Sequence, residues 1–542
     1  MKKPIVIMVI MSFGILSIFI PIANSSLYNE EIVDQSQIDI GTGCVMWNHF
    51  VSQFFKPTKT PLTKVALFLR RDGNPISDMV ISIRESVFQK TSCLDEYDMV
   101  IIAPSEFSDA IQPLINHKDS VGIKTYLKII EDIYLEYSGR DEAEKIKYFI
   151  KDAIESFGID YVLLIGNKEK LPVRYVTIHF SAEKHKEFNE FFTENLRLTN
   201  NEALDFISDL YYADIYDEKM EFCSWDTNNN SLFAEANETL FFDDVDLYPD
   251  ISIGRLLCGT SSDVNNIVNK IIQYEEKTYG ESWFNNLILV GGDSHTQIFG
   301  ELFVTIVAGK GRIAWEGEYM CEQVAKIFHT FNAKKCYGSA FFGIRANRLS
   351  TENINNAINE GAGFLLIGLH GNVDRVATHP PFTSSKLLPS PDGYWIDDID
   401  MLSNRDKLPV AVIPSCYCGD FDSVNSPFAW EFVNHQDGGS IASYALTTSG
   451  NIWPSTLATE SLSGHTAMSV FQSYSDGIEN AGDIWIECIS RYLNDDEAIT
   501  LGTMNSTSSF IKTSGVPVWM NNVALQEWIL LGDPSLKIGG YS

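Results

Sequence analysis

The chain has 542 residues, of which 45% are hydrophobic, 12% aromatic and 21% charged, a globular composition that excludes a disordered chain. Its length corresponds to about three or four ordinary domains, or to two larger α/β units. The 72 acidic and 40 basic side chains leave a formal net charge of −32, which repels a phosphate backbone and argues against nucleic acid as a partner.

The amino terminus has the form of a secretory signal. Met1-Lys2-Lys3 precedes an uncharged apolar stretch over residues 4–23, and small polar residues follow it. We expect residues 1–25 to be a signal peptide, with an uncleaved signal anchor as the alternative, because about 20 apolar residues also span a bilayer. The rest of the chain is then extracellular or on the cell surface, and meets a membrane only through this segment.

Residues 26–95 are predicted to form an N-terminal segment with a β element. Within it, residues 64–87 read as two strands joined by the turn "DGNP" at 72–75. A prosegment and a docking module are both consistent with its place before the main body.

The pattern changes from Tyr97 onwards. "YDMVIIAPSEF" predicts a short buried strand, residues 141–158 a helix closed by Gly158, and "DYVLLIGNKEKLP" from Asp160 a second buried strand. Strand, helix and strand with almost continuous apolar strands are typical of a parallel sheet with helices on both faces.

The second half repeats this arrangement. Helices are predicted over 261–279 and 351–363, and buried strands in "LILVGGD", "GFLLIGLHGN", "LPVAVIPSC" and "GSIASYALT". We therefore expect an α/β fold of two subdomains with mostly parallel, helix-covered sheets, over 96–282 and 283–542.

Two of these strands end in reactive side chains, His370 and Cys416, and ligands collect at the carboxyl ends of such strands. A histidine within reach of a thiol favours the thiolate and then protonates a leaving amine. Gly371 lets a substrate approach closely and presents an N–H towards a developing oxyanion. His379 and His435 lie near these motifs without a strand-end setting, so we expect loop or surface roles for them.

The nine cysteines form no dense disulfide framework, and their odd number leaves at least one thiol free or paired with another molecule. Cys416 and Cys418 are badly placed to bridge one another, because an extended C-x-C segment points both side chains the same way. A metal site at Cys416, Cys418 and His370 would need further ligands at firm spacing.

"GLHGN" followed by "VIPSCYCGDF" resembles the His-Gly and Ala/Ser-Cys pair of the caspase-like cysteine peptidases, the gingipain family in particular. The resemblance extends in order over residues 95–540. It includes "YVLLIGNKEKLPVRY", "DLYYADI", "LYPDISIGRLLCGTSSDVNNIVNKIIQYE", "GGSIASYALTTSGNIWPS" and "WILLGDPSLKI".

This resemblance implies a caspase-like fold and a cysteine endopeptidase that acts on proteins or peptides. Cys416 would attack the scissile carbonyl and His370 would be the general acid/base. The backbone N–H groups of Gly371 and Cys416 would bind the oxyanion. Asp250 matches a carboxylate that orients the histidine, and Trp453 matches an aromatic wall of the specificity pocket. Cys418 departs from the family, and this second thiol leaves open oxidative inactivation through a 416–418 bridge or an intermolecular bridge.

The mechanism requires no cofactor, and acidic loops such as residues 241–250 leave structural Ca²⁺ open. A transpeptidase or processing enzyme with the same dyad is the first alternative, and a non-catalytic surface binding protein is the second. Cleavage after basic residues would need a carboxylate in the pocket, which the sequence does not identify. The oligomeric state is also left open.

Overall fold

The computed structural model describes residues 96–180, 203–237, 241–294, 315–342, 346–379, 393–453, 455–502 and 519–542, together with five N-terminal strands. The chain divides into two compact units, Met1–Leu94 and Asp95–Ser542. Much of the predicted signal (1–25) and N-terminal segment (26–95) lies outside the described residues. The predicted subdomain boundary at 282/283 falls inside the second unit and stays a prediction.

The first unit contains antiparallel strands. β1 (Ile5–Ile10) pairs with β3 (Phe50–Phe55) and β5 (Val80–Glu85), and β2 (Ile15–Ile18) pairs with β4 (Leu69–Asp72). β4 and β5 are the strands predicted on either side of the turn at 72–75, but each pairs with another strand. In the part of the chain that is described, no helix is long and apolar enough to cross a membrane.

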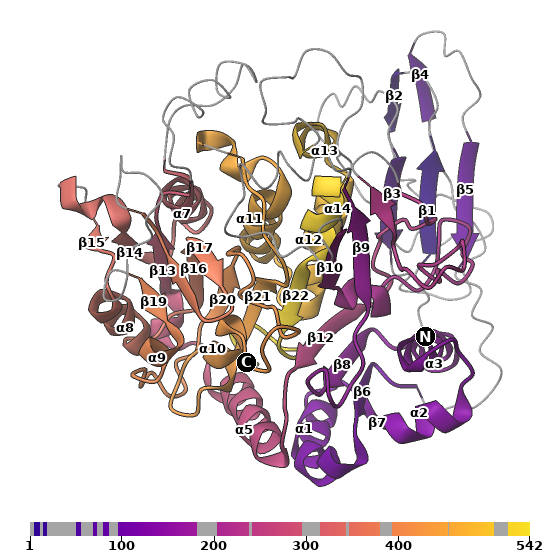
Figure 1. Ribbon diagram of the computed structural model, residues 1–542, viewed down its shortest axis with the longest axis horizontal. Helices are drawn as coiled ribbons and strands as arrows, with labels where there is room; N and C mark the ends of the chain where they lie inside the picture. The colour runs from indigo at the N-terminus through magenta and orange to yellow at the C-terminus, as the bar shows by residue number, and fades with distance from the viewer. Residues whose placement is uncertain are drawn as a thin grey trace, which may run out of the picture. The chain divides into compact units, whose positions relative to one another are not determined.

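An 11-stranded sheet forms the centre of the second unit (Figure 1). Its strands, in spatial order, are β15 (Asn347–Arg348), β14 (Asn332–Tyr337), β13 (Asn286–Gly291), β16 (Phe364–Gly368), β20 (Val410–Ile413), β21 (Ala442–Leu446), β22 (Trp528–Leu531), β12 (Ser252–Leu256), β8 (Tyr161–Ile165), β6 (Met99–Ala103) and β7 (Thr125–Ile129). The strands predicted from the apolar runs are all present in it.

The sheet consists of two parallel sets that run in opposite directions. Neighbouring strands are parallel throughout, except where β21 meets β22 in antiparallel register. The carboxyl ends of β13, β16, β20 and β21 therefore lie along one edge, and those of β12, β8 and β6 along the other. Residues that follow strands of the first set are gathered together by this geometry.

Helices flank the sheet in two groups (Figure 1). One group contains α1 (Ser108–Ser120), α5 (Ser261–Lys277), α10 (Phe428–Asn434), α9 (Ile396–Ile399) and α8 (Thr351–Asn359). The other contains α7 (Glu316–Ile327), α11 (Leu462–Ser475), α12 (Ala481–Leu493), α13 (Asp496–Gly502) and α14 (Trp519–Gln526). α2 (Ile130–Glu136) packs on α3 (Glu142–Phe157) near β7.

Shorter elements complete the unit. One small sheet contains β9 (Tyr175–His179), β10 (Ala203–Ile207) and β11 (Ala236–Asn237), and another contains β17 (His370–Asn372), β18 (Arg375–Ala377) and β19 (Tyr394–Trp395). The 3₁₀ turns are η1 (Ser105–Phe107), η2 (Asp209–Tyr212), η3 (Ser282–Asn285), η4 (Gly338–Phe342) and η5 (Ser455–Thr459).

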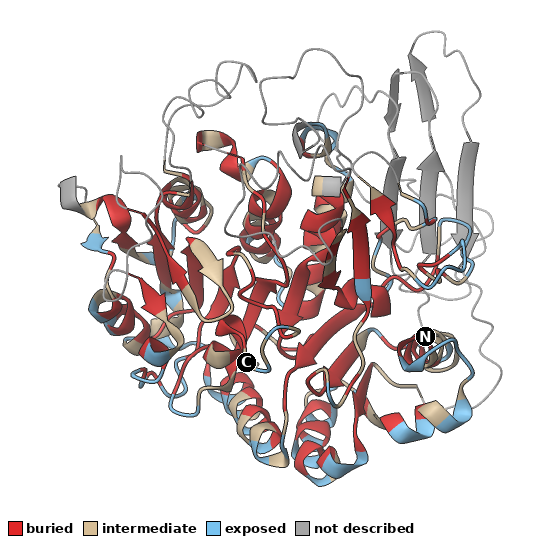
Figure 2. Cartoon of the chain, viewed as in Figure 1, coloured by how far each residue is buried: buried red, intermediate tan, exposed pale blue. Residues whose placement is uncertain are grey.

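Local sequence accounts for the ends of the predicted helices. The Asp141 side chain accepts a hydrogen bond from the Glu144 N–H at the start of α3, and Gly158 closes the helix with a φ of 70°. α5 begins with a capping box between Thr260 and Asp263. Most strands of the central sheet are buried, whereas β7, β14 and β15 near its two ends are partly buried or exposed, and helices such as α1 and α5 have exposed outer faces (Figure 2). This pattern is that of a parallel sheet covered on both faces.

Candidate functional site

His370 and Cys416 follow two neighbouring strands. β16 and β20 pair in parallel, with Leu366 opposite Val412. His370 lies two residues beyond the end of β16, and Cys416 lies three residues beyond the end of β20. The Ser415 hydroxyl donates to the Ile367 carbonyl over 3.2 Å, which ties the two strand ends together.

The turn after β20 is built around Tyr417, whose φ is 58°. Few non-glycine residues adopt this left-handed conformation, and they concentrate at functional sites. The Tyr417 N–H donates to Thr448 O over 2.9 Å, and the Gly419 N–H donates to Leu446 O over 2.8 Å, which holds the turn against the end of β21. The C-x-C segment is therefore a turn and is not extended as the sequence argument assumed, although both thiols are free.

Gly371 lies directly against this turn. A Cβ atom placed on Gly371 would come within 2.6 Å of the Cys416 carbonyl oxygen, 2.7 Å of the Ser415 Cβ and 2.8 Å of the Cys418 Sγ. Real Cβ atoms do not make such contacts, so only glycine fits here without a shift. Strand β17, which contains His370 and Gly371, is thus in van der Waals contact with the turn that contains Cys416.

Cys416 is partly exposed, whereas the other cysteines of the described residues are buried. Its Sγ lies 3.9 Å from the Ser449 Oγ and 3.6 Å from the Gly450 carbonyl oxygen. Burial raises the pKa of Cys416 above the usual value, the Ser449 hydroxyl opposes this, and the Glu527 carboxylate adds to it. A thiol in this setting needs a base to become a nucleophile.

Cys418 is buried, and its Sγ lies 3.6 Å from the Asn372 carbonyl oxygen. Burial raises its pKa well above the usual value, and the neighbouring Cys416 adds to this. Of the two thiols, Cys416 is therefore the one with the exposure that a nucleophile requires.

Trp453 is 5% exposed and packs in an apolar cluster with Leu457, Leu462, Ala524 and Met520. It follows the segment 449–451 that contacts Cys416. These contacts suit a core aromatic, and they also suit the rear wall of a pocket, so its predicted role as a pocket wall stays a prediction.

A second histidine lies beside the first. The rings of His370 and His379 have centroids 5.4 Å apart. His379 lies in a loop just after β18, one of the two settings expected from the sequence, but it is 2% exposed and so is not a surface residue. Its Nδ1 lies 3.7 Å from the Asp293 Oδ2. His435 lies elsewhere, with its Nε2 3.1 Å from the Leu402 carbonyl oxygen.

Asp293 belongs to a group of buried carboxyl groups with Glu316 and Glu318. It follows β13, and the other two residues begin α7. The Glu316 carboxylate accepts hydrogen bonds from the backbone N–H groups of Ser455 (2.6 Å) and Ser294 (3.1 Å). Burial raises the pKa of Glu316, although these bonds and one with Asp293 oppose the shift, and burial raises the pKa of Glu318 to about 7.

Asp250 lies in the loop that leads into β12. Its Oδ2 accepts hydrogen bonds from the N–H groups of Ile215 (2.7 Å) and Tyr216 (2.8 Å), and burial raises its pKa to about 7. It precedes β12, which is four strand spacings from β16, or about 19 Å at the usual separation of strands. This placement argues against the predicted role of Asp250 in orienting His370 and favours a role in holding the 213–216 turn.

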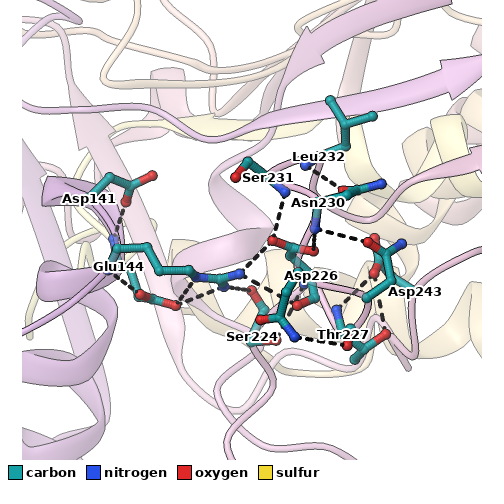
Figure 3. A network of polar contacts seen from close by, with 12 residues as sticks. Asp141, Glu144, Ser224, Asp226, Thr227, Asn230, Ser231, Leu232 and Asp243 are labelled. Atoms are coloured by element: carbon teal, nitrogen blue, oxygen red, sulfur yellow. Dashed lines mark hydrogen bonds and ion pairs between the residues drawn. The ribbon is translucent and has the colours of Figure 1, made fainter.

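The acidic loop at 241–250 uses its carboxylates to bind backbone N–H groups. Figure 3 shows Asp243 beside Thr227 and Asp226 beside Asn230 and Ser231. Asp243 accepts from the N–H groups of Thr227 (2.8 Å) and Glu235 (2.9 Å).

Within the described ranges no group of three or more His, Cys, Asp or Glu side chains is arranged to hold a metal ion. Structural Ca²⁺ stays a prediction.

Comparison with known proteins identifies the family. The model of peptidase family C25 matches residues 93–539. The chain belongs to this family. It is 20% identical over 330 residues to gingipain R2 of Porphyromonas gingivalis, a match that covers 60% of the chain and 32% of that relative. The chain thus corresponds to about a third of the curated relative's length.

Solved structures of gingipains share the fold. The Arg specific cysteine proteinase gingipain R superposes with a TM-score of 0.52 at 16% identity, covering 83% of this chain and 80% of that one. A complex of the pro- and mature domains of RgpB from Porphyromonas gingivalis gives 0.50 at 17% identity, covering 81% and 79%. The predicted caspase-like α/β fold and gingipain-family membership are confirmed, and the family to which the chain belongs is one of peptidases.

Asp293, Glu316 and His379 were not predicted from the sequence to belong to this site. Asp293 ends "LILVGGD", one of the predicted buried strands, so its strand-end position was available as a signal. Glu316 had no comparable signal, because the start of α7 brings it to this part of the molecule from far along the chain. His379 is close to His370 in sequence, across the β17–β18 hairpin, but the sequence pattern did not show that it is buried beside Asp293.

Proposed function

We propose that this member of family C25 is an exported endopeptidase in which Cys416 is the nucleophile and His370 is the general acid/base. The observation that carries the proposal is the contact of Gly371 with residues 415–418, which joins strand β17 to the turn that contains Cys416 at the ends of adjacent strands. The partial exposure of Cys416 supports the same assignment.

The proposed reaction has two stages. His370 takes the Cys416 proton, Sγ bonds to the scissile carbonyl carbon, and the N–H groups of Gly371 and Cys416 bind the oxyanion. His370 then protonates the leaving amine as the C–N bond breaks. In the second stage water gives a proton to His370 and its oxygen to the thioester carbon, and the C–S bond breaks to release the acid. The protonated His370 then returns its proton to the Cys416 sulfur, which restores the starting state.

We further propose Asp293, in place of Asp250, as the carboxylate that orients the histidines. The 3.7 Å separation between Asp293 Oδ2 and His379 Nδ1, and the contact of the His379 and His370 rings, support this assignment. A carboxylate beside a histidine fixes the tautomer and stabilises the imidazolium that forms in the reaction.

The proposed substrate preference is for basic residues on the amino side of the scissile bond. Glu316 supports it, because this buried carboxyl group is bonded to the Ser455 N–H, two residues beyond Trp453. A cationic side chain would relieve the cost of burying Glu316, Glu318 and Asp293 together. One solved relative is named as Arg specific, in keeping with this preference.

Export and activation are also proposals. Residues 1–25 would direct secretion or anchor the chain, as the positive start and the apolar stretch of this segment indicate. Residues 26–95 would act as a prosegment or docking module, and the solved complex of pro- and mature domains gives a precedent in a relative.

A peptide library digested by the wild type and by Cys416→Ala tests the nucleophile, the reaction and the preference together. We expect cleavage after Arg or Lys with a free acid product, and a loss of about 10⁴-fold or more in Cys416→Ala. Equal activity of the variant would refute Cys416 as nucleophile. Amide products with an added amine would show a transpeptidase, and cleavage confined to neutral or acidic residues would refute the preference.

A further inference from the structure

Glu527 is a buried carboxyl group beneath the loop that borders Cys416. It precedes β22 and is 0% exposed. Its Oε1 accepts a hydrogen bond from the Ser463 hydroxyl over 2.5 Å, whereas its Oε2 has no hydrogen-bond partner among the described residues. A buried carboxyl oxygen without a partner costs free energy, so this glutamate calls for an explanation.

A continuous chain of hydrogen bonds leads from Glu527 towards Cys416. The Ser463 Oγ accepts from the Asn451 N–H, and the Ser463 N–H donates to the Asn451 carbonyl oxygen, both over 3.1 Å. The Asn451 side-chain amide donates to the Ser449 carbonyl oxygen over 3.2 Å. The loop held in this way presents the Ser449 hydroxyl and the Gly450 carbonyl to Cys416 Sγ.

The same loop is fixed at its other end by the backbone of Glu527. The Thr447 N–H donates to the Glu527 carbonyl oxygen over 2.9 Å. Segment 447–451 is therefore attached to residue 527 at its first residue, and through Ser463 at its last. A loop held at both ends keeps its polar groups at fixed distances from the nucleophile.

We propose that Glu527 is a positioning residue of the peptidase site, which holds segment 447–451 against Cys416 through Ser463 and does so as a neutral carboxylic acid. The inference rests on the proposed function, because it assumes that Cys416 is the nucleophile.

The charge state of Glu527 matters because Cys416 lies within its electrostatic reach. Burial raises the pKa of Glu527 to about 8, although the bond from Ser463 opposes the shift, so the group is mostly protonated at neutral pH. Ser463 of α11 and Thr447 of the loop form hydrogen bonds with Glu527 in the described structure, and neither residue carries a charge. An ionised Glu527 raises the pKa of Cys416, and a neutral one leaves the thiolate easier to form.

Four variants test the proposal in the full chain. Glu527→Gln keeps an acceptor for Ser463 and removes the charge, Glu527→Ala and Ser463→Ala break the link, and Ser469→Ala is the control. Ser469 is a buried serine of the same helix whose hydroxyl bonds only to the His465 carbonyl in the described structure.

We expect Glu527→Ala and Ser463→Ala to lose about tenfold to a hundredfold in kcat/KM, mainly in kcat, since displacement of reacting groups by about 1 Å has such an effect. Glu527→Gln should retain activity near neutral pH, and Ser469→Ala should match the wild type. If Glu527→Ala does not fold, Ser463→Ala carries the test.

The rate at which iodoacetamide labels Cys416 separates an effect on the nucleophile from an effect on the stability of the fold. Labelling of the remaining thiols is measured in Cys416→Ala and subtracted. In Glu527→Gln the labelling rate should match the wild type at pH 6.5 and exceed it severalfold at pH 9, where the wild-type carboxylate opposes the thiolate. Equal rates at both pH values, or Ser463→Ala activity equal to that of Ser469→Ala, would overturn the proposal. Activity that survives in Cys416→Ala would instead overturn the proposed function.

Discussion

Tyr417 and Gly371 show how single residues shape this site. Tyr417 adopts a left-handed backbone conformation between the two cysteines, and its N–H is bonded to Thr448. Gly371 meets the same turn at distances that admit no side chain. The sequence indicated both reactive residues, because each follows an apolar strand, but it gave no sign of the tyrosine's conformation, which long-range contacts hold in place.

Single substitutions test which carboxylate, Asp293 or Asp250, orients the histidines. We expect Asp293→Asn to lower kcat by about tenfold or more, because an amide does not stabilise the imidazolium. Asp250→Asn should change kcat little, since an amide oxygen still accepts from Ile215 and Tyr216. Steady-state kinetics of both variants gives the two kcat values. A large loss of kcat in Asp250→Asn alone would show that Asp250, as predicted from the sequence, orients His370.

Helices and strands were predictable where local patterns were strong. The helix predicted at 141–158 is α3, with Asp141 and Gly158 as its caps, and the helix predicted at 261–279 begins at the Thr260 capping box of α5. β16 and β20 follow from their apolar runs. The partners of β4 and β5 were not predictable in this way, because a turn motif indicates where a chain reverses and not which strands then pair.

The contact between strand β17 and the turn after β20 gives a prediction at the level of elements. We expect Gly371→Ala to reduce kcat/KM by about a hundredfold, since the added Cβ forces the strand and the turn apart. Gly259→Ala is the matched control, because its Cβ would meet neighbours no closer than 3.5 Å. The test measures kcat/KM of both variants, after their melting temperatures have shown that they are equally stable. Equal kcat/KM values would argue against a functional contact.

At the scale of the whole molecule, an ion cluster joins distant elements under the sheet. Lys118 of α1 lies 2.8 Å from the Glu275 Oε1 of α5 and 2.7 Å from the Asp533 Oδ2 after β22, and all three side chains are buried. Burial alone would raise the pKa of Glu275, but Lys118 and the bond from His117 outweigh it, and the pKa is lowered. Burial would lower the pKa of Lys118, but Asp533 and Glu275 outweigh it and raise the pKa.

These shifts predict how stability depends on pH. A lowered Glu275 pKa contributes stability above its unfolded pKa of about 4.3, which is lost as the pH falls through the folded value. A raised Lys118 pKa contributes stability that is present below about pH 10. We expect Glu275→Gln to lose about 3–5 kcal/mol at pH 7, because it leaves a buried cation with one partner fewer.

The loss in Glu275→Gln should be smaller at pH 4 than at pH 7, since the wild type then loses part of the same interaction. Urea denaturation at the two pH values measures it. A loss of equal size at both would show that Glu275 acts through packing alone.

The sequence by itself determined the elements of this protein, the α/β class and the two strand-end residues His370 and Cys416. Apolar periodicity, helix caps and strand ends depend on residues close together in the chain, so they can be read without a structure. Only the tertiary structure decided that Asp293 lies between His379 and Glu316, that Asp250 lies before a strand four places from β16, and that Glu527 lies beneath the loop beside Cys416. Those positions depend on the order and direction of strands far apart in sequence, which the long-range packing of the whole chain selects.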